Sequence, residues 1–128
     1  MRCTALIVDD DEKIRKMLQF LLMAKGYKVE LATDGISGLE AFKNMKPDIV
    51  LLDLMMPEMN GFEFYKRAKE DSCIKDIPIL ILTANLSNEV NRELDALGAE
   101  NRMAKPFKSA KLLAALDTAL DGKGKGVH

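Results

Sequence analysis

Three uninterrupted aliphatic runs restrict the fold of this chain more than any other feature. They read ALIV, IVLL and ILIL and occupy residues 5–8, 49–52 and 79–82. A strand with one face in solvent alternates apolar and polar residues, whereas a continuous apolar run is typical of a strand buried on both faces. The sequence therefore predicts a sheet that is covered by helices on both sides.

Apolar residues at helical spacing lie between these runs. The first stripe comprises Ile14, Met17, Leu18, Leu21 and Leu22, and Gly26 follows it as a helix stop. Further stripes fall at residues 36–45, 62–68, 86–97 and 113–120, and weaker strand patterns fall at 28–33 and 100–104. Five strands alternating with five helices predict a single α/β domain with a parallel sheet and right-handed crossovers. We expect it to span residues 1–121, with 122–128 as a flexible tail or the start of a linker.

The composition excludes several classes of protein. Lys plus Arg (19) nearly balance Asp plus Glu (20), so no general nucleic-acid or membrane surface is indicated. No apolar run approaches the roughly 20 residues of a membrane span, and no signal peptide is evident. Cys3 and Cys73 lack metal-ligand spacing, which favours a cytoplasmic protein with reduced thiols over one with a disulfide.

Polar residues follow the predicted strands at one edge of the sheet. Asp9 and Asp10 follow the first strand, Asp53 the third, Thr83 the fourth and Lys105 the fifth. Ligands of open α/β sheets bind outside the carboxyl ends of the strands, so these side chains are expected to meet.

The neighbouring acidic residues have a simpler interpretation. Asp11 and Glu12 also follow the first strand, where they are expected to serve only the start of a helix.

Carboxylates gathered in a partly dry pocket repel one another, and at least one should be shifted toward protonation. A hard divalent cation or the ammonium of Lys105 would relieve this repulsion. Magnesium suits the set, because it needs only one or two carboxylates together with waters and phosphate oxygens.

Four segments resemble one known family. LIVDDDEKIR, DIVLLDLMMPEMNGFE, IPILILTA and MAKPF are similar to the receiver domains of two-component response regulators, the CheY-like family. The resemblance runs from about Ala5 to Leu120 and implies a flavodoxin-like sheet with strand order 2-1-3-4-5. It also implies a signalling switch that catalyses its own Mg²⁺-dependent phosphorylation and slow dephosphorylation.

The resemblance implies roles for the acidic residues. Asp53 matches the aspartate that accepts a phosphoryl group from a phosphohistidine, and Asp9 and Asp10 match the acidic pair that positions Mg²⁺. Asp10 and Asp53 would bind the metal directly, Asp9 through water, and Met55 through its backbone carbonyl. A carboxylate nucleophile is a recognised route for covalent phosphoryl transfer.

The resemblance also implies switch and tuning positions. Thr83 matches a hydroxyl that turns toward the phosphoryl group, and Lys105, in a Lys-Pro peptide that is often cis, matches the lysine that pairs with it. Met55 and Asn85 lie where relatives vary residues that control water access. Arg102 departs from the family, whose members usually carry Tyr or Phe there. We expect its side chain to lie largely outside and to tune partner contacts.

Three alternatives remain. A haloacid-dehalogenase-type phosphohydrolase usually carries Asp-x-Asp at the end of the first strand and a cap domain, whereas here the proposed nucleophile follows the third strand and no cap is expected. A nucleotide-binding fold would carry a glycine-rich loop after the first strand, which is missing here. A receiver-like binding module that is never phosphorylated is the more serious rival. Such modules normally lose the acceptor, the acidic pair or the lysine, and this chain has all of them.

The expected partners follow from the resemblance. The only histidine is His128, so the phosphoryl group must come from a sensor kinase or phosphotransfer protein. The surface around the fourth helix, fifth strand and fifth helix would act on a downstream protein or on an output domain absent from this chain. A monomer or a weak phosphorylation-dependent dimer is expected, with no direct nucleic-acid or membrane contact.

Overall fold

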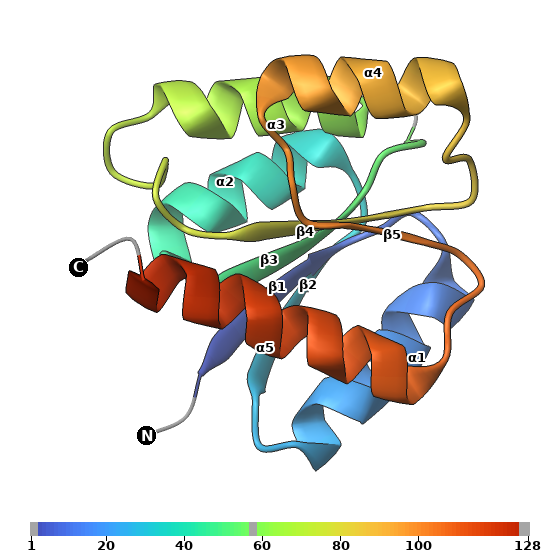
Figure 1. Cartoon of the computed structure of the whole chain (residues 1–128). Helices are drawn as coiled ribbons and strands as arrows, with labels where there is room; N and C mark the ends of the chain where they lie inside the picture. Colours follow the sequence, from blue (N-terminus) through green and yellow to red (C-terminus); the bar gives the residue numbers. More distant parts are fainter. Residues whose placement is uncertain (1–2, 57–58, 126–128) are drawn as a thin grey trace.

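The computed structural model describes residues 3–56 and 59–125 and has five strands alternating with five helices (Figure 1). The strands are β1 Thr4–Val8, β2 Lys28–Ala32, β3 Ile49–Asp53, β4 Ile79–Thr83 and β5 Arg102–Ala104. The helices are α1 Glu12–Ala24, α2 Gly35–Met45, α3 Gly61–Glu70, α4 Asn88–Leu97 and α5 Ser109–Lys125.

The strands form one parallel sheet in the order β2-β1-β3-β4-β5, which confirms the predicted topology. Every residue of β3 and β4 is buried, as their continuous aliphatic sequences predict. The edge strands β2 and β5 are partly exposed, which is why their sequence patterns are weaker.

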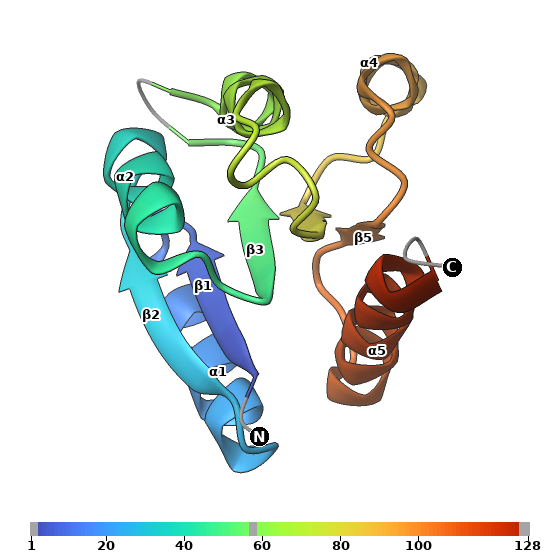
Figure 2. The ribbon, with the colours of Figure 1, turned by 90° about the vertical axis from the view of Figure 1, so that its left-hand side faces the viewer.

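Two helical layers cover the sheet (Figures 1 and 2). Helices α2, α3 and α4 pack on one face, where Phe42 and Phe64 stack with ring centroids 6.0 Å apart. Helices α1 and α5 pack on the other face, where Leu18, Leu22 and Leu116 are fully buried. The residues of β1, β3 and β4 alternate between the two clusters, so each of these central strands has apolar neighbours on both faces, as its sequence requires.

Polar caps set the starts of the helices. The side chain of Asp11 accepts hydrogen bonds from the backbone N–H groups of Lys13 and Ile14, and Glu12 pairs with Lys16 on the helix surface. This confirms the expectation that Asp11 and Glu12 serve the first helix. Ser87 caps α4 in the same way. At the other end of α4, Gly98 has φ of 75°, a left-handed conformation that favours glycine.

The chain end differs from the expected boundary. Helix α5 continues to Lys125, so residues 122–125, expected in a tail or linker, are helical. Glycine weakens a helix by about 1 kcal/mol relative to alanine but does not break it as proline does, so the Gly-Lys repeat does not end α5. Residues 126–128 of the predicted tail lie outside the described part of the chain.

Two other expectations concern the chain as a whole. Cys3 and Cys73 are both free and exposed. Within residues 3–56 and 59–125, no helix is long and apolar enough to cross a membrane.

Candidate functional site

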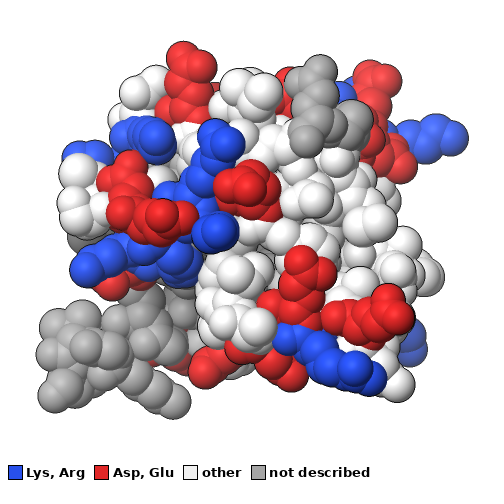
Figure 3. Space-filling view, turned by 90° about the horizontal axis from the view of Figure 1, so that it is seen from above, with Lys and Arg blue, Asp and Glu red and all other residues white. Residues whose placement is uncertain are grey.

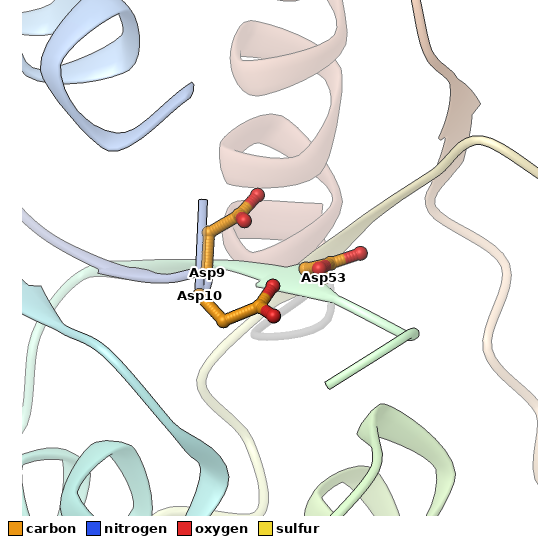
Figure 4. A group of neighbouring side chains, drawn as sticks. All are labelled: Asp9, Asp10 and Asp53. Atoms are coloured by element: carbon orange, nitrogen blue, oxygen red, sulfur yellow. The ribbon is translucent and has the colours of Figure 1, made fainter. Parts of the chain in front are cut away.

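Three carboxylates meet at the carboxyl edge of the sheet. Asp9, Asp10 and Asp53 each offer an oxygen, and these atoms lie within 4.8 Å of one another (Figure 4). The strand register explains the meeting, because Val8 pairs with Leu52 and the next residue of each strand carries a site carboxylate. The sequence prediction of an oxygen-rich site at this edge therefore agrees with the geometry.

The three carboxylates differ in exposure. Asp9 and Asp53 are buried, with 1% and 6% of their surface accessible, whereas Asp10 is exposed. The oxygens thus line a site that is dry on the strand side and open on the side of Asp10. An ion or a small solute can reach such a site from solvent.

Lys105 supplies the positive charge. Its Nζ lies 2.7 Å from Oδ2 of Asp9 and 3.5 Å from Oδ1 of Asp53. Three carboxylates and one ammonium leave the cluster with excess negative charge, and hard oxygen ligands with unneutralised charge are the donor set that Mg²⁺ prefers. These residues fit the magnesium site implied by the sequence.

The pKa of Asp53 reflects this imbalance. Burial, followed by the negative charge of Asp9, raises the pKa to about 6, although Lys105 and the backbone N–H of Met55 oppose the shift. The expectation that one carboxyl would be shifted toward protonation agrees with this value. At neutral pH, Asp53 is still mainly ionised and so retains nucleophilic oxygens.

Met55 lies beside Asp53 on the open side. Its backbone N–H donates to Oδ1 of Asp53 across 3.3 Å, and 57% of its surface is exposed. Metal binding by its carbonyl stays a prediction.

Thr83 and Lys105 are linked through the backbone. Lys105 N–H donates to the Thr83 carbonyl across 2.8 Å, and the Lys105–Pro106 peptide is cis, as expected. Thr83 is fully buried, and its hydroxyl accepts a 3.2 Å hydrogen bond from Asn85 N–H. Asn85 is exposed, and its side chain accepts from Ser87 N–H. The hydroxyl is thus engaged with the β4–α4 loop.

Arg102 does not lie where the sequence placed it. Its side chain is only 17% exposed, and it pairs with Asp95 on α4 rather than extending into solvent. The expectation of an outward charge failed because α4 and the turn after it present oxygen atoms toward β5, which a guanidinium satisfies.

Arg15 is a site neighbour that the sequence did not single out. Its guanidinium donates to the backbone carbonyl of Asp9 across 2.8 Å and so ties α1 to the acidic loop. No pattern distinguishes it from Lys13 or Lys16, since all three lie among charged residues at the start of α1.

A groove between α2 and α3 lies apart from the acidic cluster. Its lining includes Glu40, Lys43, Glu63 and Arg67. The face that carries α2, α3 and α4 shows acidic and basic side chains intermixed (Figure 3). This mixture agrees with the balanced charge of the sequence.

Fold and site together define a flavodoxin-like α/β domain whose acidic cluster lies between β1 and β3, where the strand order reverses. The family model for the response regulator receiver domain matches residues 5–117. The chain belongs to this family, the receiver domains of two-component signalling.

Known proteins of the same kind agree. Response regulator MprA of Mycobacterium sp. (strain KMS) is 42% identical over 116 residues, which are 90% of this chain and 49% of that protein. The chain thus spans about half the length of the curated relatives it matches. Chemotaxis protein CheY4 of Vibrio cholerae superposes with a TM-score of 0.87 and 38% identity over 93% of this chain and 99% of that one. A CheY-like receiver domain protein from Methanospirillum hungatei JF-1 gives 0.91 and 28% identity over 98% and 99%.

Proposed function

We propose that Asp53 accepts a phosphoryl group from a phosphohistidine of a sensor kinase or phosphotransfer protein. One observation carries the proposal: a buried aspartate at the end of a central strand lies against two other carboxylates and 3.5 Å from a lysine. A carboxylate oxygen of Asp53 attacks phosphorus, and the P–N bond of the donor breaks. Its electron pair returns to the imidazole, which is then free to take a proton from water.

Asp9, Asp10 and Asp53 would hold Mg²⁺, with Asp9 acting through water and the Met55 carbonyl as a further ligand. The bound ion would neutralise charge on the phosphoryl oxygens. The convergence of three carboxylates supports this assignment, because Lys105 is the one cationic side chain that forms ion pairs with them among the residues that the structure describes.

In this proposal Lys105 leaves its ion pair with Asp9 and pairs with the phosphoryl group on Asp53. Its ammonium lies closer to Asp9 than to Asp53, so it is held at the site before the reaction. A phosphoryl group on Asp53 adds negative oxygens within its reach, and charge-assisted hydrogen bonds to such oxygens are strong.

Thr83 would convert the new charge into a conformational change at the protein surface. Its hydroxyl is engaged with Asn85 N–H, so turning toward a phosphoryl oxygen releases one contact of the β4–α4 loop. We expect the Thr83→Ala variant to accept the phosphoryl group and to lose most of the accompanying change in α4. A complete change in this variant would exclude the hydroxyl as the trigger.

The output of the domain is proposed from its relatives. The α4-β5-α5 surface would act on a downstream protein or on an output domain of a longer regulator. We propose that the domain works in the cytoplasm as a monomer or weak phosphorylation-dependent dimer, without direct contact to nucleic acid or membrane. The free thiols of Cys3 and Cys73 support that compartment.

The test is the intact mass after incubation with Mg²⁺ and acetyl phosphate. We expect one added phosphoryl group in the parent and in Asp117→Asn, a matched variant at an exposed aspartate of α5, and none in Asp53→Asn. Omitting Mg²⁺ should abolish the gain in the parent and in Asp117→Asn. No gain in the parent, with Mg²⁺ shown to bind, would instead support a binding module that works without phosphorylation.

A further inference from the structure

Helix α4 is held to the domain by few apolar contacts. Leu94 is its only buried residue, whereas α2 and α3 each bury four residues. Val90 and Leu97 are only partly buried against the core. Hydrophobic burial therefore fixes α4 less firmly than its neighbours, and its polar contacts matter more to its position.

Arg102 supplies those polar contacts from β5. Its Nη1 donates to the Asn91 side chain at 2.9 Å and to the Asn91 carbonyl at 3.2 Å. Its Nη2 lies 2.7 Å from both Oδ1 of Asp95 and the Ala99 carbonyl, and its Nε donates to the same carbonyl at 3.2 Å. One guanidinium thus satisfies oxygens at two positions of α4 and in the turn behind it.

These contacts differ from those of Arg67 and Glu63, an arginine–carboxylate pair that lies within a single helix. Arg67 and Glu63 lie one turn apart on α3, and both side chains are about half exposed. Such pairs contribute little, because water and salt screen them. Arg102 joins two separate elements, and it is mostly shielded from solvent.

The position of Arg102 in β5 connects these contacts to the acidic site. Strand β5 has three residues, in which Arg102 pairs with Ile81 and Ala104 pairs with Thr83. Lys105 follows directly and contacts Asp9. A displacement of this strand at Lys105 would therefore be transmitted to Arg102 over a distance of three residues.

We propose that Arg102 is a positioning residue that latches α4 to β5 and couples the position of α4 to the strand end that carries Lys105. The latch itself is independent of the chemistry at Asp53. Its signalling role rests on the proposed function, because the force on β5 would come from Lys105 as it pairs with a phosphoryl group. The guanidinium is suited to this role since its fixed fork serves several oxygens at once, which a lysine ammonium cannot match.

The latch is tested by hydrogen exchange of the unmodified protein. We expect the amides of α4 to exchange about tenfold faster or more in Arg102→Met, which keeps the apolar stem, while β3 stays protected. Arg102→Lys should recover only part of the protection. The matched control Arg67→Met should leave α4 within about twofold of the parent. Unchanged α4 exchange in Arg102→Met would overturn the latch.

A second variant decides the matter should Arg102→Met fail to fold. Asp95 is 70% exposed, so Asp95→Asn removes one partner without burying a new group. We expect faster exchange confined to α4 and its turn, by about threefold. The double variant Asp95→Asn/Arg102→Lys should show less than the product of the single effects, because the two residues share one contact. Independent effects would contradict a shared contact.

The coupling is tested after treatment with Mg²⁺ and acetyl phosphate. We expect the phosphorylated parent to change its exchange in α4, and the Arg102→Met variant to gain the phosphoryl group with a much smaller change. An equal change in both would overturn the coupling and leave the latch. A parent that gains no phosphoryl group would overturn the proposed function and the coupling, whereas the latch is still decided by the unmodified proteins.

Discussion

Strand β3 and helix α4 show opposite ways of holding a segment in one domain. All five residues of β3 are buried, between two paired strands and two helical layers. Helix α4 buries one residue and depends on an arginine from the neighbouring strand. The proposed acceptor carboxylate therefore lies on a fully buried strand, and the proposed output surface includes a helix with little apolar burial.

This difference suits a switch. Phosphoryl transfer depends on positioning, so the nucleophile benefits from a strand that does not move. A conformational signal needs an element whose alternative positions differ by only a few kcal/mol. The two requirements are met by separate parts of the chain, which Thr83 and β5 would couple in the proposed switch.

The largest effect is expected from the same truncation made in both regions. Leu52→Ala removes a fully buried side chain of β3 and should lower the free energy of unfolding by about 2–5 kcal/mol. Leu97→Ala in α4 removes a partly buried side chain and should cost about 1–2 kcal/mol. Urea denaturation of both variants checks this, and equal losses would mean that α4 is as firmly packed as β3.

The next largest effect concerns the carboxylate of Asp53, at the end of β3, and its influence on stability at different pH values. The raised pKa of Asp53 means that the folded protein binds a proton more tightly than the unfolded chain, so stability falls as pH rises from 3.8 to about 6. Without metal at pH 7, Asp53→Asn should therefore be more stable than the parent by about 1–3 kcal/mol.

Denaturation midpoints at several pH values measure this difference. It should vanish below about pH 3, where both states of the parent are largely protonated, and it should shrink when Mg²⁺ stabilises only the parent. A pH-independent difference would show that the ionisation of Asp53, disfavoured by burial and by the charge of Asp9, is not its cause.

Substitutions of Gly61, beside β3, and Gly98, at the end of α4, should have smaller effects that also differ between the two regions. A Cβ at Gly61 would lie 2.6 Å from Cα of Leu54 and 2.8 Å from the Asp53 carbonyl, so Gly61→Ala must displace α3 or the end of β3. We expect a loss of about 1–3 kcal/mol and slower phosphorylation. At Gly98 there is open space but a φ of 75°, so Gly98→Ala should cost about 1–2 kcal/mol without slowing phosphorylation. Equal phosphorylation rates in the two variants would contradict the contrast.

The smallest effect is expected at Met55. Its exposed apolar side chain offers no hydrogen bond to a water that attacks the phosphoryl group. Met55→Asn should shorten the phosphoryl lifetime about threefold, the effect of one modest hydrogen bond. The decay of the phosphorylated mass measures it, with Met23→Asn on α1 as the exposed control. An unchanged decay would remove Met55 from the tuning positions.

The sequence predicted the sheet well because parallel strands that are buried on both faces have continuous apolar sequences. The runs at 49–52 and 79–82 are aliphatic at every position, and both are fully buried. The same reasoning placed Asp9, Asp53, Thr83 and Lys105 at one edge. It could not set the distances that make Lys105 closer to Asp9 than to Asp53, since these depend on side-chain packing across four strands.

Arg102 shows what the sequence could not resolve. A charged residue in a weak strand pattern is normally exposed, and its partners are 3 to 11 residues away along the chain. Only the position of α4 over β5 brings the Asn91 and Ala99 carbonyls within reach. Backbone carbonyls have no residue type to recognise, so contacts of this kind are invisible in a single sequence.

The most direct test of the contrast is hydrogen exchange of the parent before and after phosphorylation with acetyl phosphate and Mg²⁺, with the added phosphoryl group confirmed by intact mass. We expect residues 88–97 of α4 to change their exchange several-fold, while residues 49–53 of β3 keep their protection. Equal changes in both segments, or an unchanged α4 in fully phosphorylated protein, would contradict it.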